Sequence, residues 1–198
     1  GEIRLNGRNL RDFRPAELAR KIAVLAQQHT ISYGYTVEEI VQLGRYAHQR
    51  GLLGRRDEDG PDAIEWALEL TGMKLLRKRS LLELSGGEVQ RAFLAQVLAQ
   101  EPEILLLDEP FGALDAKIRL ELQQLLEQLW CSGEKRKTVI FVTHDIREAV
   151  QLASRILFMA PGKIVADIPV DLPRPRQQLL GEGAQMRKQL QNRLLQLF

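Results

Sequence analysis

Two short apolar runs that end in polar residues constrain the fold of this 198-residue chain more than any other feature. The stretch Ile104–Glu109 is apolar up to its last two residues, and the apolar run Val139–Val142 leads directly into Thr143-His144. Uninterrupted apolar runs of this length are typical of strands that are buried on both faces of a parallel sheet. Since a helical pattern over residues 116–130 separates them, we expect an α/β protein whose parallel sheet is covered by helices on both faces.

The composition excludes several classes of protein. The chain has 28 Lys and Arg residues against 26 Asp and Glu, a net charge of +2 that is too balanced to indicate a nucleic-acid partner. The single cysteine, Cys131, excludes a disulfide scaffold and a cysteine-rich zinc site. No apolar run approaches the roughly 18 residues that a membrane-spanning helix needs.

A helical lobe is predicted to interrupt the α/β core. The apolar run Ile22–Leu25 indicates another buried strand. Beyond it, Thr36–Glu39 has the form of a capping box. Residues 61–72 have the pattern of a helix that begins with Pro and ends with Gly. The charged stretch 45–60 is predicted to be an exposed loop. We therefore divide the chain into residues 1–32 and 101–183 of the core, the helical lobe 33–100, and a C-terminal amphipathic helix 184–198.

The two carboxylates that end the run Ile104–Glu109 are candidates for catalysis. Ligands of open α/β sheets bind beyond the carboxyl ends of the strands, and adjacent carboxylates there are costly to desolvate without a cation. Asp108 is therefore a candidate ligand of a magnesium ion that keeps most of its water. Glu109 points the other way in an extended chain and is a candidate general base for an attacking water. The alternative is a pair of solvated carboxylates that simply close the strand.

Two further segments carry candidate phosphate-binding groups. Ser85-Gly86-Gly87 precedes a predicted helix over residues 88–100, where backbone N–H groups and the helix dipole favour an anion. An ordinary helix start with a glycine turn is the alternative explanation. His144 ends the strand Val139–Val142 and lies beside the acidic pair if the two strands are neighbours. Its alternative role is a structural hydrogen bond.

The order of these motifs resembles the ATP-binding subunit of ABC transporters. The resemblance identifies Leu84–Glu88 with the signature motif, Ile104–Glu109 with Walker B and its catalytic glutamate, Ala113-Leu114-Asp115 with the D-loop, and His144 with the switch histidine. It also identifies Gln27 with the Q-loop glutamine, with Gln28 as the alternative register. It implies a RecA-like P-loop NTPase core with an inserted α-helical subdomain, and ATP and Mg²⁺ as cofactors. The resemblance implies that Glu109 and His144 are the catalytic residues and that Asp108 and Gln27 are the metal ligands. The residues that it implies contact the nucleotide are Gln27, Ser85, Gly86, Gly87 and Asp115.

Two departures from the family pattern affect what we expect. Glu88 stands where the family usually has glutamine, so its charge must turn away from a bound phosphate. The sequence contains no Gly-x-x-x-x-Gly-Lys-Ser/Thr motif, and the family's P-loop precedes the residue that matches Gly1. The chain therefore resembles an N-terminally truncated subunit, and we expect it alone to bind ATP poorly and not to turn it over.

The resemblance also implies partners. In this family two ATPase subunits enclose two ATP molecules, so Ser85 and Gly87 would serve a nucleotide that a second copy holds. The pair acts peripherally at the cytoplasmic face of the membrane on transmembrane permease subunits, which an extracytoplasmic substrate-binding protein supplies, and residues 27–35 are the expected docking surface. A non-catalytic module that pairs with a complete ABC ATPase is the main alternative. A related DNA-repair ATPase is disfavoured because its long coiled-coil insertion is missing.

The sequence resembles two branches of importers. Residues 36–48 resemble the branch that imports iron siderophores, haem and cobalamin. Residues 111–115 and 168–176 resemble the nitrate, sulfonate and taurine importers. We favour the iron-chelate branch because the helical lobe faces the permease in this family.

Overall fold

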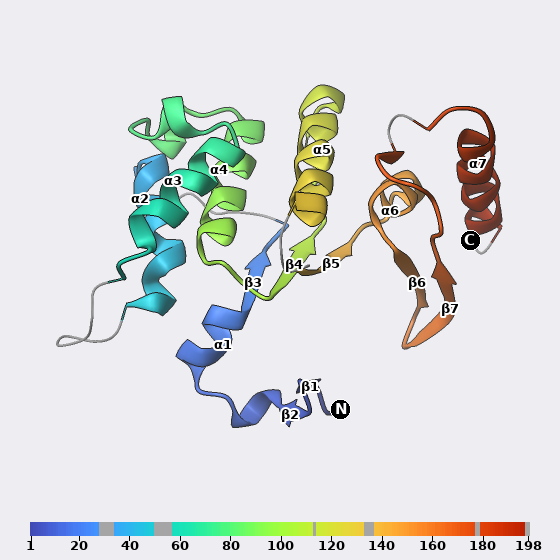
Figure 1. The fold of residues 1–198 in the computed structure, drawn as a ribbon, viewed down its shortest axis with the longest axis horizontal. Coiled ribbons are helices and arrows are strands. Elements are labelled where there is room, and N and C mark those ends of the chain that lie inside the picture. The colour runs from blue at the N-terminus through green and yellow to red at the C-terminus, as the bar shows by residue number, and fades with distance from the viewer. Residues whose placement is uncertain (28–33, 50–56, 113, 133–136, 177–178, 197–198) are drawn as a thin grey trace.

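The computed structural model describes residues 1–27, 34–49, 57–112, 114–132, 137–176 and 179–196. Its strands and α-helices, in chain order, are β1 (Arg4–Leu5), β2 (Arg8–Asn9), α1 (Pro15–Lys21), β3 (Ile22–Leu25), α2 (Val37–Leu43), α3 (Gly60–Leu70), α4 (Gly86–Ala99), β4 (Ile104–Asp108), α5 (Ala116–Ser132), β5 (Thr138–Val142), α6 (Ile146–Leu152), β6 (Arg155–Ala160), β7 (Lys163–Pro169) and α7 (Gly181–Leu195). Short 3-10 helices are η1 (Leu10–Asp12), η2 (Gly44–His48), η3 (Lys74–Leu76) and η4 (Leu81–Glu83). Figure 1 shows the central strands between a helical lobe (α2 to α4) on the left and a C-terminal part (α6 to α7) on the right.

The central sheet is parallel and, within the described residues, has the strand order β3-β4-β5. Leu25 lies opposite Leu107, and Leu107 lies opposite Phe141. The apolar runs predict all three strands, which confirms the α/β class; β4 continues to Asp108 and β5 begins at Thr138. Because parallel strands run in one direction, the segments that follow them all leave the sheet at the same edge.

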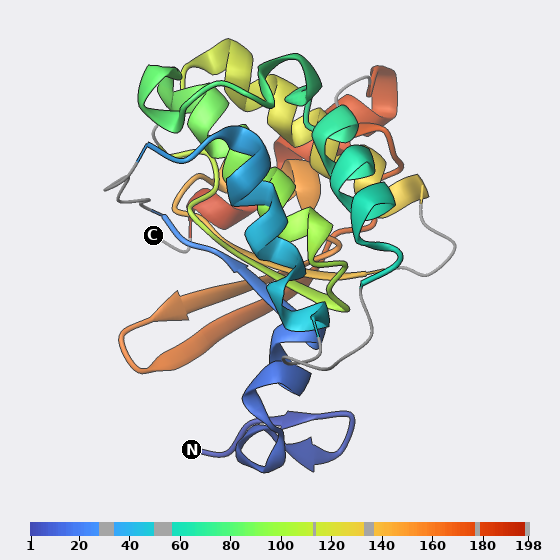
Figure 2. The same ribbon diagram turned by 90° about the vertical axis from the view of Figure 1, so that its left-hand side faces the viewer.

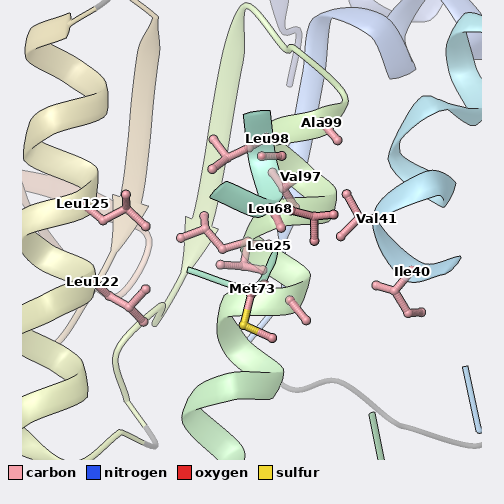
Figure 3. Packing of buried hydrophobic residues seen from close by; sticks show 14 of the residues in the cluster. Leu25, Ile40, Val41, Leu68, Met73, Val97, Leu98, Ala99, Leu122 and Leu125 are labelled. Carbon is pink, nitrogen blue, oxygen red and sulfur yellow. The ribbon is translucent and has the colours of Figure 1, made fainter. Parts of the chain in front are cut away.

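One face of the sheet packs against α4 and α5. Leu25 and Leu107 on this face are only 2% and 1% exposed. They belong to the same core as Leu98 on α4 and Leu122 and Leu125 on α5 (Figure 3). Burying each of these leucine side chains favours folding by about 2 kcal/mol. The core therefore fixes the strands that lead to the candidate site.

The opposite face of the sheet is apolar but open in the described part of the chain. Val24, Ile140 and Val142 are 59%, 52% and 59% exposed. Val24 and Ile140 both pair with Leu106, so they lie in one row across the sheet. Figures 1 and 2 show α2 to α5 gathered on the other side of β3, β4 and β5, whereas α1 lies with the N-terminal hairpin away from them. The prediction of helices on both faces is therefore wrong for the described residues, because α4 and α5 pack on the same face.

The helical lobe begins with the predicted capping box. The Thr36 hydroxyl accepts a hydrogen bond from the Glu39 backbone N–H at 3.3 Å, and the Glu39 carboxylate accepts one from the Thr36 N–H at 2.8 Å. Val37 and Val41 on the inner face of α2 are fully buried, in the same core as Leu68 on α3 (Figure 3). The cap satisfies two backbone N–H groups that the helix itself cannot pair.

Arg45 contradicts the expectation that residues 45–60 form an exposed loop. It lies in η2 and is only 3% exposed. Its guanidinium donates twice to the Asp57 carboxylate, at 2.7 Å each, and also to the Ala99 carbonyl and the Glu101 carboxylate. The sequence pattern missed this because the charge is buried by partners distant in sequence, which compensate its desolvation. Residues 50–56 lie outside the described residues.

Acid is expected to weaken the lobe. Lys78 and then Arg77 donate to the Glu38 carboxylate and hold its pKa below the ordinary value of 4.5. A carboxyl whose pKa is lowered by folding contributes stability above its unfolded pKa, and this contribution is lost as pH falls through the folded pKa. We expect the free energy of unfolding from urea titrations to fall between about pH 6 and about pH 3.5, and to fall less in Glu38→Gln. Parallel losses in both proteins would contradict this assignment.

The C-terminal part has its own apolar core. The antiparallel pair β6-β7 and the helices α6 and α7 enclose Val150, Ile168 and Leu194. The amphipathic helix predicted over 184–198 begins at Gly181, and its Leu194 is 1% exposed while Met186 is 48% exposed. In the described residues neither α7 nor another helix has the length and apolar content to cross a bilayer.

Candidate functional site

Glu109 lies at the centre of the candidate site. The Gln27 amide donates to its Oε2 at 2.7 Å, and Nδ1 of His144 lies 3.1 Å from its Oε1. We call Gln27, Glu109 and His144 the Glu109 cluster. Each member follows a different strand of the central sheet, at the edge where those strands end. The sequence places His144 beside the acidic pair only if their two strands are neighbours, and β4 and β5 are neighbours.

The backbone of Glu109 helps to place its side chain. Its N–H continues the sheet by donating to the Val142 carbonyl at 2.9 Å, while its φ of 43° turns the chain sharply out of the strand. A left-handed conformation is uncommon for a residue other than glycine and costs of order 1 kcal/mol or more. The next turn is tight as well, because Gly112 N–H donates to the Glu109 carbonyl at 3.1 Å. The carboxylate is thereby fixed with its side chain 27% exposed, beside a His144 that is 77% exposed.

Asp108 does not join the Glu109 cluster. It is the exposed last residue of β4, opposite Val142. The described residues contain no group of three or more His, Cys, Asp and Glu side chains that could hold a metal ion by themselves. Magnesium is commonly held by one or two carboxylates together with water and substrate phosphates. The carboxylate of Asp108 and the amide oxygen of Gln27 are oxygen ligands of the kind that magnesium prefers.

Ser85 and Glu88 form a second capping box, which was not predicted from the sequence. The Ser85 N–H and hydroxyl both donate to the Glu88 carboxylate at 2.8 Å, and the Glu88 N–H donates back to the hydroxyl at 3.4 Å. The Ser85 backbone and then its hydroxyl hold the pKa of Glu88 below its ordinary value. The Ser-x-x-Glu spacing was the signal that could have revealed it. The glutamate charge is therefore turned back onto the start of α4.

Within the described residues, the start of α4 at residues 84–88 lies near the segment after Glu109 without a hydrogen bond to the Glu109 cluster. The Gln90 amide on α4 donates to the Pro110 carbonyl at 3.1 Å. A Cβ on Gly87 would lie 2.9 Å from Ile118 on α5, so this glycine permits the close approach of the two helices. Ser85 and Gly86 are exposed.

Asp115 also lies outside the Glu109 cluster, at the start of α5. Its carboxylate accepts hydrogen bonds from the backbone N–H groups of Lys117 and Ile118 at 3.0 and 3.1 Å. Ala113 of the same motif, Gln28, and most of the expected docking segment, including Ile31 and Tyr33, lie outside the described residues. Tyr35 at the end of that segment is 45% exposed.

The comparisons with known proteins agree on one family. A protein-family model described as "ABC transporter" matches residues 1–112. The ferric enterobactin transport ATP-binding protein FepC of Escherichia coli is 41% identical over 166 residues, which are 84% of this chain and 60% of that protein. The aliphatic sulfonates import ATP-binding protein SsuB 3 of Pseudomonas syringae pv. tomato is 46% identical over 135 residues, 68% of this chain and 49% of the relative.

A solved structure supports the fold. The dimeric structure of MJ0796, a bacterial ABC transporter cassette, matches with a TM-score of 0.71 and 30% identity, over 86% of this chain and 73% of that one. The chain spans about half to 60% of the length of the two curated relatives. The activity of those relatives therefore depends also on residues outside the part that this chain matches.

Proposed function

The chain belongs to the ABC transporter family of ATP-binding proteins, and from this membership we propose that it is part of an ATP-hydrolysing subunit that powers import through a separate membrane permease. The observation that carries the proposal is the Glu109 cluster. A carboxylate that lies 2.7 Å from an amide and 3.1 Å from an imidazole, at the ligand-binding edge of a parallel sheet, is suited to orient and polarise a water molecule.

Each member of the Glu109 cluster has its own part in the proposed reaction. Glu109 accepts a proton from the attacking water as general base. His144, whose ring is mostly exposed beside it, contacts the terminal phosphate through its second ring nitrogen, Nε2. Gln27 donates to Glu109 through its amide nitrogen, and its amide oxygen remains to face the metal ion. When bound, magnesium neutralises charge on the nucleotide phosphates.

We propose that ATP is shared between two subunits. The 198 residues contain no Gly-x-x-x-x-Gly-Lys-Ser/Thr loop, so the contacts they supply are those of the hydrolysing edge and of the signature segment. Ser85 and Gly86 are exposed at the first turn of α4, where a nucleotide held by another subunit can reach them. Asp115, exposed at the start of α5, is proposed to face the same interface.

The domain division, partners and location are part of the same proposal. The lobe 33–100 is proposed to contact the transmembrane permease subunits at the cytoplasmic face, while residues 1–32 and 101–183 hold the nucleotide and 184–198 close the C-terminal core. A substrate-binding protein outside the membrane would deliver the cargo indirectly. Importer subunits for iron chelates and for sulfonates are both among the relatives, and we propose an iron chelate as the first cargo to test.

The test is ATP hydrolysis by the complete gene product that contains this chain. Glu109→Gln keeps the size of the side chain but removes the general base, so we expect kcat to fall by about 10²- to 10⁴-fold while nucleotide binding in calorimetry is retained. His144→Ala is expected to change kcat in the same direction.

Glu103→Gln is the matched control. This carboxylate lies next to the other end of β4, is 54% exposed and pairs with Lys21 at 2.6 Å, so its loss should leave kcat unchanged. Wild-type hydrolysis by Glu109→Gln would overturn the proposal. A gene product that neither binds nor hydrolyses ATP, but stimulates a complete ABC ATPase, would instead support the non-catalytic module.

A further inference from the structure

A buried carboxylate lies directly behind the turn that carries His144. Glu148, in the first turn of α6, is only 6% exposed. The Thr143 hydroxyl donates to its Oε2 at 2.7 Å, and the Asp145 backbone N–H donates to the same hydroxyl at 3.0 Å. The residues on both sides of His144 are thus held through one carboxylate. His144 itself is 77% exposed, so packing does not fix its ring.

The other oxygen of Glu148 faces the D-loop side of the site. Arg119 on α5 approaches it, with Nε 3.7 Å from Oε1. The same guanidinium donates through Nη2 to the carbonyl of Leu114 at 3.3 Å. In the described part of the chain Arg119 Nε is buried without a hydrogen-bond partner. Arg119 therefore lies between the segment before α5 and the carboxylate that holds the His144 turn.

The contacts of the Glu148 carboxylate are poorly suited to stabilising the fold. Burial raises the pKa of Glu148, and the Thr143 hydroxyl and Arg119 offset this increase only in part. The 3.7 Å separation from Arg119 is too long for a hydrogen bond, so the desolvated carboxylate is incompletely compensated. What the contacts do achieve is a fixed path of the backbone on both sides of an exposed histidine.

We propose that Glu148 is a positioning residue, which holds the Thr143–Asp145 turn so that the His144 ring meets Glu109. It also joins this turn, through Arg119, to Leu114. The inference deepens the proposed function, because its catalytic consequence rests on the role of His144. Its structural content does not require ATP and can be tested on the 198-residue chain.

The first test observes the His144 ring by ¹⁵N NMR. The chain has three histidines, so the ring signals are few and can be assigned by His144→Ala. Glu148→Ala is expected to shift the Nδ1 signal of His144 in the same direction as Glu109→Gln does. Glu148→Gln keeps an acceptor for the Thr143 hydroxyl and should restore most of the signal. An unchanged His144 signal in Glu148→Ala would overturn the inference.

Two controls separate positioning from general damage. Glu127 is a second buried carboxylate, and its Oε1 lies 3.2 Å from Nη1 of Arg174. It does not belong to the Glu109 cluster, so Glu127→Ala should leave the His144 signal in place. If Glu148→Ala does not fold, Thr143→Val removes only the hydroxyl, and Thr143→Ser should restore it. A His144 signal that Thr143→Val does not move would also contradict the inference.

The second test is hydrolysis by the complete gene product. A small displacement of a catalytic group lowers turnover more than it lowers binding. Glu148→Ala should therefore lower kcat by about 10- to 100-fold, with KM changed by less than about 3-fold. If His144→Ala hydrolyses normally, the proposed function fails while the ring signals can still uphold the positioning. If His144→Ala is impaired and Glu148→Ala is not, the positioning inference alone fails.

Discussion

Arg176→Met is expected to lower the free energy of unfolding by about 3 to 5 kcal/mol, because it removes a buried guanidinium and leaves the carbonyls that accept from it without that donor. Arg176 is 2% exposed, and its side chain donates to five backbone carbonyls. These carbonyls belong to Val150, Gln151, Ala153, Val170 and Leu172. Burial lowers the pKa of Arg176 to about 10, so the group stays charged at neutral pH.

Removing this donor leaves the end of α6 and the segment after β7 with unpaired buried carbonyls. Urea titration followed by circular dichroism measures the loss. Arg155→Met is the control, because Arg155 pairs with Asp167 on the surface, where an ion pair contributes about 1 kcal/mol or less. Arg176→Lys should fall between the two, since an ammonium cannot reproduce the planar fork. A loss in Arg176→Met no larger than in Arg155→Met would refute the argument.

Gly44→Ala is expected to destabilise the chain by about 3 kcal/mol, against the usual direction of such a change. Gly44 has helical dihedral angles (φ −57°, ψ −30°), and there alanine is normally favoured by about 1 kcal/mol. A Cβ at this position would lie 2.1 Å from the carbonyl oxygen of Gln96. That atom is backbone of α4 and cannot move without shifting the helix.

Gly86→Ala is the matched control for Gly44→Ala. A Cβ on Gly86 meets no atom within 4 Å, and the residue opens α4. We therefore expect no loss of stability, or a gain of up to about 1 kcal/mol. The same urea titrations compare the two variants. Equal stability of both would show that α4 can yield where Gly44 touches it.

Local sequence pattern predicted the parts of the fold that depend on neighbours in the chain. The apolar runs at Ile22, Ile104 and Val139 are strands, and the Thr36 box caps α2. The convergence of Glu109 and His144 was also predictable, since it needs only that two neighbouring parallel strands end at one edge.

Burial of charge could not be predicted from the sequence. Arg45, Glu148 and Arg176 all appear in polar contexts, yet each is less than 7% exposed. The partners of Arg45 lie elsewhere in the sequence and those of Arg176 are backbone carbonyls, while Glu148 accepts from the nearby Thr143 hydroxyl. No pattern of apolar and polar side chains records these contacts. The face of the sheet that helices cover was unpredictable for a similar reason. Apolar runs reveal that both faces are apolar, but they do not say on which side a following helix packs.

The separate core of the C-terminal part has a consequence for how the site can fail. Val150 anchors α6 in that core, whereas β4 and Glu109 belong to the sheet and its helices. Regions with separate cores open as distinct cooperative units, each at its own free energy. Opening of the C-terminal unit would withdraw His144 while Glu109 and Gln27 stay in place. Amides of α6 should therefore exchange with deuterium sooner than those of β4, and the proposed catalytic arrangement should be lost well before the whole molecule unfolds.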